Sequence, residues 1–347
     1  MKMKQNIKLM GQAGVSLVEV LVAMVISLFL LAGIVQVYLG NKTTFAFTNA
    51  LAEIQENGRY ALDVMTQDIR MAGEWGCVAF DPDDTSNINN TLDAVSVPGY
   101  TAATHAFEEN DAVNGTDNTG LNGSDTVTIM GGKPGQTNVE SPFTRPAVRN
   151  ITTNAINSIQ ANDIILLARC GKNDLKKVAS ADILRVTGIA NVNADSQRQI
   201  NLSSAKSQQF ENDATVIELQ TVTYSIANGA NGEPSLWRSE FGNNVELVEG
   251  VEDMQILYGI DTDAPDPDGY PNQYVTSDNV GDFGAVVAVR VMLLVRSIDD
   301  FVTEDPQTYT FNNITTTPGD RRIRQNFTTT IALRNRIGVE TLISTGP

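Results

Sequence analysis

Histidine and cysteine are scarce in this sequence, and their scarcity limits the chemistry that the chain can perform. The 347 residues include one histidine, His105, and two cysteines, Cys77 and Cys170. No serine lies in a G-x-S-x-G motif, so a Ser/His/Asp hydrolase has no support. The absence of a C-x-x-C pair and of a second histidine disfavours a zinc site. We therefore expect no enzymatic activity and no cofactor, and we interpret His105 as a side chain without a catalytic role.

Basic residues are also few, with 24 Lys and Arg against 41 Asp and Glu and a formal charge of −17. This balance argues against duplex DNA or anionic lipid as the main partner, and we expect no nucleic-acid binding. The local cluster "RRIR" at 321–324 is interpreted as an exposed basic turn that balances an acidic surface, with phosphate-backbone binding as the alternative. The stretch "MGGKPGQT" at 130–137 lacks the G-x-x-x-x-G-K-[ST] spacing, which excludes a phosphate loop.

Long hydrophobic runs are limited to one. Residues 15–39 carry a single charge, Glu19, and a helix of that length crosses the roughly 30 Å hydrocarbon layer of a bilayer. The longest later run, 284–297, is interrupted by Arg290 and Arg296 and is rich in valine. Such a run predicts a buried strand and not a second membrane span.

The residues before the apolar run predict its orientation. The first 14 residues contain three lysines and no acid. By the positive-inside rule this end stays in the cytoplasm, and residues beyond about 41 lie across the membrane. Cys77 and Cys170 both fall on that far side, where oxidising conditions let a disulfide persist, as in a bacterial periplasm or at a cell surface. A bridge would close a loop of about 90 residues, worth on the order of 4–5 kcal/mol; two unpaired thiols are the alternative.

The N-terminus departs from an ordinary secretory signal. A signal peptide has a short apolar core followed by small residues at its cleavage site. Here the small residues "GQAG" at 11–14 precede an apolar segment that is too long for that role. Cleavage after Gly14 would leave the apolar helix on the mature protein.

This arrangement, a glycine followed by "VSLVEVLVAMVISLFLLAG", resembles the class III signal of type IV prepilins and type II secretion pseudopilins. The resemblance implies that prepilin peptidase cleaves between Gly14 and Val15 and that Val15 becomes the N-methylated terminus. Glu19 then occupies the fifth mature position, where this family carries a glutamate important for assembly. Val15 departs from the more common phenylalanine at the first position.

Four further segments resemble the large minor pilin PilW and its relatives, which include the J-type pseudopilin. They are "QENGRYALDVMTQDIRMAGEWGC" (55–77), "LVEGVEDMQILYGID" (247–261), "VVAVRVMLLVRS" (286–297) and "FTTTIALRNR" (327–336). The resemblance implies a minor pilin of the type IV pilus, in the priming or tip complex, with a J-type pseudopilin of type II secretion as the alternative. The implied partners are other minor pilins, the major pilin, prepilin peptidase, the inner-membrane assembly platform and a tip adhesin.

Glu19 can also be interpreted from physical chemistry alone. An ionised carboxylate in the bilayer interior costs several kcal/mol, so it is expected to face a partner. In a pilin-like assembly that partner is a free α-amine, such as the mature Val15 terminus of an adjacent subunit, because opposite charges attract strongly at low dielectric. The alternative is a glutamate near the helix end that snorkels to the interface.

Helical periodicity continues beyond the apolar run, with one helix predicted from Val15 to Met71, roughly 85 Å long. Gly73 is the expected stop, and the helix is expected to bend or loosen near Gly40. We expect a leader at 1–14, a transmembrane or filament-core helix at 15–39, its amphipathic continuation at 40–71 and a periplasmic β-rich head at 72–347. After cleavage the anchored protein would pass from the inner membrane to the pilus at the cell surface.

The head is predicted to be mainly antiparallel β-sheet with the helix packed on one face, an α+β, pilin-like fold. Residues 72–120 are predicted to be loop, and "NGANGEP" at 228–234 predicts a hairpin connection. The long middle section leaves open a second β subdomain. Strand patterns bounded by turn residues occur at 125–130, 163–169, 181–189, 214–227, 235–239, 251–260, 284–297, 307–311 and 327–335.

One acidic loop has the composition of a cation site. Asp261, Asp263, Asp266 and Asp268 precede Gly269, and hard oxygen ligands on a tight turn suit calcium. Two prolines interrupt the loop, however, the alternation breaks between Asp263 and Asp266, and no glutamate follows at the twelfth place. We interpret the loop as solvated, with calcium as the alternative. A membrane-tethered enzyme or sensor is disfavoured because no convergent cluster of titratable groups is visible.

Overall fold

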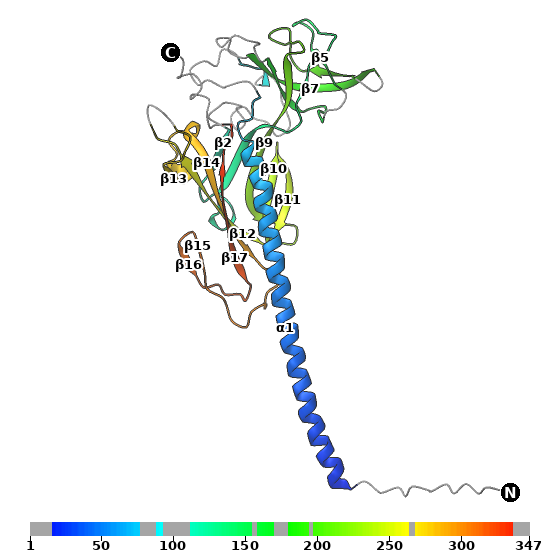
Figure 1. Cartoon of the computed structure of the whole chain (residues 1–347), viewed down its shortest axis with the longest axis vertical. Coiled ribbons are helices and arrows are strands. Elements are labelled where there is room, and N and C mark those ends of the chain that lie inside the picture. Colours follow the sequence, from blue (N-terminus) through cyan, green and yellow to red (C-terminus); the bar gives the residue numbers. More distant parts are fainter. Residues whose placement is uncertain are drawn as a thin grey trace, which may run out of the picture.

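The computed structural model of the chain describes residues 16–76, 88–92, 112–154, 158–169, 180–193, 197–263 and 268–335. Figure 1 shows a β-rich head attached to the upper part of one long helix, whose lower part stands free of it. The helix and the mainly antiparallel sheets confirm the predicted α+β, pilin-like architecture.

Helix α1 (Leu17–Arg70) contains 54 residues, about 80 Å at 1.5 Å per residue. Ser16 caps its start, because the Ser16 Oγ accepts a hydrogen bond from the Val18 amide at 3.3 Å. Met71 ends the helix, and Gly73 then adopts a φ of 70°, a conformation that glycine adopts without strain. Both predicted ends are therefore confirmed to within two residues. α1 runs through Gly40 without a break, so the loosening expected there is not seen.

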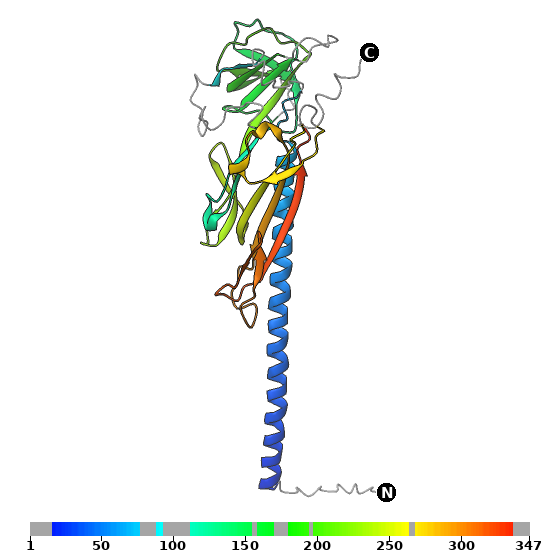
Figure 2. The same cartoon turned by 90° about the vertical axis from the view of Figure 1, so that its left-hand side faces the viewer.

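The smaller sheet has four strands in the order β13-β12-β14-β17, all antiparallel. Its strands are β12 (Val251–Ile260), β13 (Gln273–Val275), β14 (Val286–Arg296) and β17 (Arg324–Ala332). The valine-rich run predicted as a buried strand forms β14, which lies between two neighbours. β17 lies beside α1 in both views (Figures 1 and 2).

The larger sheet contains the path β11-β10-β9-β6-β7-β8-β5. The long strand β9 connects its two halves, pairing with β6 near its start and with β3 and β10 farther along. The hairpin expected at 228–234 joins β9 to β10. The strands are β1 (Ile88–Asn90), β2 (Val113–Thr116), β3 (Thr126–Gly132), β4 (Thr137–Asn138), β5 (Asn150–Asn154), β6 (Ile164–Arg169), β7 (Ser180–Asn193), β8 (Gln197–Leu202), β9 (Ala214–Asn228), β10 (Pro234–Glu240) and β11 (Asn243–Glu249).

The hydrophobic interior of the head forms three separate clusters. The largest joins the buried face of α1 to both sheets and includes Ile54, Met65, Tyr224, Tyr258 and Val291. The other two clusters lie among β3 to β9 and contain no residue of α1. The part of the head built on β5 to β8 therefore packs without the helix, an organisation that fits the second β subdomain left open above.

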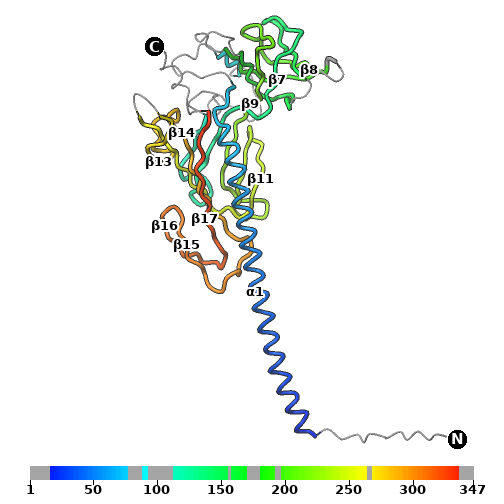
Figure 3. Tube along the Cα trace, viewed as in Figure 1, coloured from blue at the N-terminus to red at the C-terminus, as the bar shows by residue number. Residues whose placement is uncertain are grey.

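Some polar strands do not show the expected alternation of apolar and polar residues. β8 has the sequence "QRQINL" and β11 "NNVELVE", and neither was predicted. The prediction that 72–120 is loop is wrong at β1 and β2, which are held in place by pairing with β7 and β3. Strand β15 (Tyr309–Phe311) pairs with β16 (Ile314–Thr316) in a small hairpin near the base of the head (Figure 3). These segments form strands because they pair with neighbouring strands, and a single sequence carries little information about such pairing.

Candidate assembly helix and its attachment to the head

The lower part of α1 is bare. Every residue from 16 to 49 is exposed, and Ala50 is the first buried one. This part contains a window of mean hydropathy 2.7 with none of it buried. An apolar surface of this length requires lipid or other protein chains around it.

Hydroxyl side chains on the bare helix bond within the helix itself. Ser27 donates to the carbonyl oxygen of Ala23 at 2.7 Å, and Thr43 and Thr44 donate to the carbonyls four residues earlier at 3.0 and 2.9 Å. Because their hydrogen bonds are made locally, these residues can enter an apolar environment without leaving a donor unpaired.

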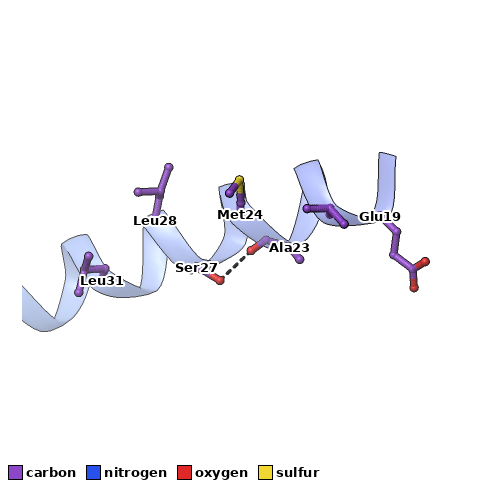
Figure 4. Close-up of a pocket in the computed structure, with 7 residues that line it drawn as sticks. Glu19, Ala23, Met24, Ser27, Leu28 and Leu31 are labelled. Carbon is purple, nitrogen blue, oxygen red and sulfur yellow. Dashed lines mark hydrogen bonds between the residues drawn. The ribbon is translucent and has the colours of Figure 1, made fainter. Parts of the chain in front are cut away.

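Glu19 lies in the first turn of α1, where the exposed amide groups of a helix favour a negative charge. Figure 4 shows its carboxylate reaching away from the helix, next to a face formed mostly by apolar residues such as Met24, Leu28 and Leu31. No hydrogen bond or ion pair holds this side chain within the described part of the chain. The Glu19 carboxylate is thus available to a group outside the subunit.

The upper end of α1 is tied to the head by charge. The Asp68 Oδ2 accepts hydrogen bonds from the Tyr224 hydroxyl at 2.6 Å and from the Arg238 Nε at 2.9 Å. Arg238 also pairs with Glu240 at 2.8 Å. Lys133 lies 2.6 Å from Glu240, and so the network continues from the helix into the larger sheet.

Glu240 and Arg238 in this network favour their charged forms. Burial opposes ionisation of Glu240, but hydrogen bonds from Lys133 and Arg238 prevail and lower its pKa. Burial likewise opposes the charge on Arg238, yet its bonds to Glu240 and Asp68 raise the pKa of the guanidinium. Removal of one partner would leave a partly buried charge unpaired.

The "MGGK" sequence, rejected above as a phosphate loop, forms the seat for the end of the helix. The Gly73 amide donates to the Met130 carbonyl at 2.9 Å, and the Gly132 amide donates to the Glu74 carbonyl at 2.7 Å. A Cβ at Gly131 would lie 2.6 Å from the carbonyl oxygen of Met71. The backbone after α1 can therefore approach β3 closely only because glycine is present there.

The basic cluster at 321–324 is engaged within the head. Arg322 pairs with Glu233 at 3.0 Å, and Arg324 pairs with Glu252 at 2.6 Å and with Asp320 at 2.7 Å. The side chains of Arg322 and Arg324 are 15% and 4% exposed. The interpretation of this segment as an exposed basic turn is therefore wrong for these two residues, because nearby acidic side chains pair with their charges.

The acidic loop brings three of its four aspartates together. Carboxylate oxygens of Asp261, Asp263 and Asp268 lie within 4.8 Å of one another, while Asp266 is outside the described residues. The two oxygens of Asp261 already accept the amides of Asp263 at 3.1 Å and Gly269 at 2.7 Å. These bonds explain how the turn is formed without a metal, and calcium binding stays a prediction.

Other residues singled out in the sequence lie outside the described part of the chain. These are Gly14 and Val15 at the expected cleavage site, Cys77 and Cys170 of the expected disulfide, and His105. The cleavage, the methylation and the disulfide therefore remain proposals. The features that sequence reasoning missed are the Asp68 network and the glycine seat; only the unusual "MGGK" spacing hinted at the second.

Comparisons with known proteins agree with this geometry. Residues 223–335 match the family model of type IV pilus-assembly protein W, PilW, and residues 9–35 match the prokaryotic N-terminal methylation motif. In these two regions the chain is similar to a PilW-type pilin, and the PilW model covers about a third of its residues. The matched PilW region includes the whole smaller sheet and the β10–β11 hairpin, and the methylation motif contains Glu19 and the start of α1.

A structural comparison also finds a type IV-like pilin from Thermus thermophilus. The two share 12% sequence identity over 51% of this chain and 87% of the Thermus chain, with a TM-score of 0.21. No functionally curated protein matches the chain significantly. The methylation motif and the bare helix are those of a membrane-anchored pilin, and such a motif implies processing by prepilin peptidase and contact with pilus components.

Proposed function

We propose that this PilW-type chain is a minor pilin that acts in type IV pilus assembly, in the priming or tip complex. Its prepilin form is inserted in the inner membrane, with the N-terminus cytoplasmic and the head periplasmic, and is cleaved between Gly14 and Val15. The observation that carries the proposal is the division of α1 into a docked upper part and a bare apolar lower part with one acid. Such a helix suits a subunit that leaves lipid and enters a filament.

Glu19 has two environments in this scheme. In the bilayer its charge is costly, whereas in the filament it lies beside the α-amine of an adjacent subunit. Pairing lowers the free energy of the assembled state relative to the membrane state. In this subunit the N-methylated Val15 supplies the corresponding amine to a neighbour.

The size of the head supports a place at the tip. The predicted head, 72–347, extends sideways well beyond the helix (Figures 1 and 2). Close helical packing leaves limited room for such a head at a repeated position in the filament wall. Its neighbours would be other minor pilins and the major pilin, with the assembly platform below and a tip adhesin above.

The decisive experiment compares Glu19→Ala with Glu53→Ala, an exposed acid farther along the same helix. We expect both variants to insert in the membrane. Glu19→Ala should be lost from sheared pilus fractions, and Glu53→Ala should be present at the wild-type level. Normal incorporation of Glu19→Ala would refute the pairing mechanism.

The same fractions test the machine to which the chain belongs. Presence of the wild-type chain in sheared pili, with loss of piliation on deletion, supports the pilus. A secretion defect with normal pili would instead assign the chain to a type II secretion system as a J-type pseudopilin.

A further inference from the structure

Strand β17 forms an open edge of the smaller sheet. Among the described strands it pairs with β14 alone, at the end of the order β13-β12-β14-β17. An edge strand presents a row of backbone N–H and C=O groups that a further strand can bind. The edge lies beside α1, because the Gly58 position contacts the ring of Phe327.

The register identifies which groups face outward. The Leu333 amide donates to Val287 and the Ser297 amide donates to Ile323, each at 2.9 Å. Because inward and outward groups alternate along an antiparallel strand, the odd-numbered residues of β17 bond to β14. The even-numbered residues therefore direct their backbone groups away from the sheet, and from residue 326 onward their side chains are exposed: Asn326, Thr328, Thr330 and Ala332.

This edge lacks the usual protection against pairing. Natural edge strands are commonly guarded by lysine, proline or a β-bulge. From 325 to 332 the strand has no charge and no proline, and its register with β14 is unbroken. Among the described residues only the lower end is covered, where the Asn326 side chain donates to the Thr310 carbonyl of β15 at 2.6 Å. The backbones of Thr328, Thr330 and Ala332 bond to no described residue, although the Thr330 hydroxyl accepts from the Arg290 Nε at 3.2 Å.

We propose that the open edge of β17 binds an extended, uncharged segment from the head of an adjacent pilus subunit. This inference rests on the proposed assembly function. A neighbour that covers the bare part of α1 would bring its own head alongside β17, which lies against the same helix directly above (Figure 2). A neutral edge in a chain with a formal charge of −17 also suits an uncharged segment better than a charged one.

The direction of β17 relative to α1 argues against antiparallel binding of a second copy of this chain. Gly58 lies against Phe327, and Asn335 donates to the Ala72 carbonyl at 3.2 Å, so β17 and α1 run the same way. Two copies joined through antiparallel β17 strands would therefore direct their membrane helices in opposite directions. Subunits anchored in one membrane cannot adopt that arrangement, which excludes antiparallel pairing of two copies through β17.

The experiment introduces proline into the edge strand β17 of the full-length chain. Thr328→Pro removes an outward amide and leaves the bonds to β14 intact, which edge strands tolerate. Thr328→Ala is the matched control, and Thr329→Pro removes an inward amide that faces Val291. We expect Thr328→Pro to have the melting temperature of the wild type. Its amount in sheared pili should fall about tenfold, which is the effect of losing one or two hydrogen bonds.

Amide exchange supplies a second readout. In the isolated chain in detergent, the amides of Thr328, Thr330 and Ala332 should exchange rapidly and those of Thr329 and Ile331 slowly. In sheared pili that contain the chain, all five should be protected. Protection of the outward amides already in the isolated chain, or rapid exchange in pili, would overturn the proposal.

The outcomes separate this inference from the function on which it rests. If wild-type chain is absent from pili, the assembly function fails. If wild type and Thr328→Pro are present in equal amounts while Glu19→Ala is absent, the assembly function stands and the edge pairing is refuted. If Thr328→Pro is unfolded, the exchange measurement on the wild-type chain decides.

Discussion

Gly58 is a position at which α1 packs closely against the head. A Cβ built on it would lie 2.4 Å from the ring of Phe327, so any larger side chain must displace that ring or the helix. From propensity alone this glycine is a weak point of the helix, because alanine is better by about 1 kcal/mol. The tertiary contact reverses the preference.

Gly58→Ala should therefore destabilise the head by about 1–3 kcal/mol, the usual cost of overpacking. Gly40 provides the control, because nothing lies within 4 Å of a Cβ placed there. Gly40→Ala should leave the melting of the head unchanged. Thermal unfolding of the full chain in detergent measures both variants, and equal melting temperatures would contradict the close packing.

Asp125 is a buried carboxylate that joins the two sheets. It is 3% exposed, and its oxygens accept the Asn118 amide at 2.9 Å and the Ile256 amide at 2.7 Å. Burial raises the pKa of Asp125 from 3.8 to about 6, against the opposing effect of these hydrogen bonds, and the nearby Asp117 adds to the rise. In the unfolded chain the pKa returns to its ordinary value.

This shift predicts a pH dependence of stability. Below pH 4, Asp125 is protonated in both the folded and the unfolded state. Between about pH 4 and 6 it keeps its proton only in the folded state, so the free energy of unfolding falls as pH rises. The loss is complete above pH 6, at about 1–3 kcal/mol. Asp125→Asn should remove this slope and lower stability, because an amide cannot accept both backbone bonds. Unfolding between pH 4 and 7.5 tests this, and an unchanged slope would refute it.

At the scale of elements, α1 serves two environments with one continuous helix. Its upper part is held by burial of Ile54, Met65 and Ile69 and by the Asp68 network, while its lower part is exposed. In the assembly function proposed above, force on the helix during extraction from the membrane would pass through this junction. We expect the charged network to contribute to the strength of the junction.

Arg238→Met tests the junction. The substitution keeps an unbranched side chain but leaves Asp68 without its cation and Glu240 with Lys133 alone, and it should cost on the order of 1–3 kcal/mol. Double replacement with Asp68→Asn should recover part of the loss, because the unpaired carboxylate on the helix is then gone. Urea unfolding of the single and double variants gives the coupling, and strict additivity would exclude an interaction between the two residues.

At the scale of the whole molecule, the bare helix should dominate behaviour in the cell. The full chain is expected to sediment with membranes, to resist extraction by alkali and to be released by detergent, because about 30 Å of apolar helix remains in the bilayer. Immunoblotting of the fractions measures this. Release by alkali alone would show that the helix does not span the membrane.

Much of this architecture follows from local sequence. The apolar run with Glu19, the helix ends at Ser16 and Met71, and valine-rich β14 were predictable because hydrophobic periodicity and capping act within a few residues. The PilW resemblance extended the prediction to function. The roles of Gly58, Gly131 and the arginines at 322 and 324 were not predictable, because each depends on a residue far away in the chain.

The sequence by itself determined that this protein has one apolar helix with an acid, Glu19, near its start, followed by a β-rich head. Those features depend on composition and short-range periodicity. Only the tertiary structure decided where the helix becomes bare, which charges are paired and which strand is left at an edge. Burial, ion pairing and strand order depend on contacts between segments that are distant in sequence, and these contacts exist only in the folded chain.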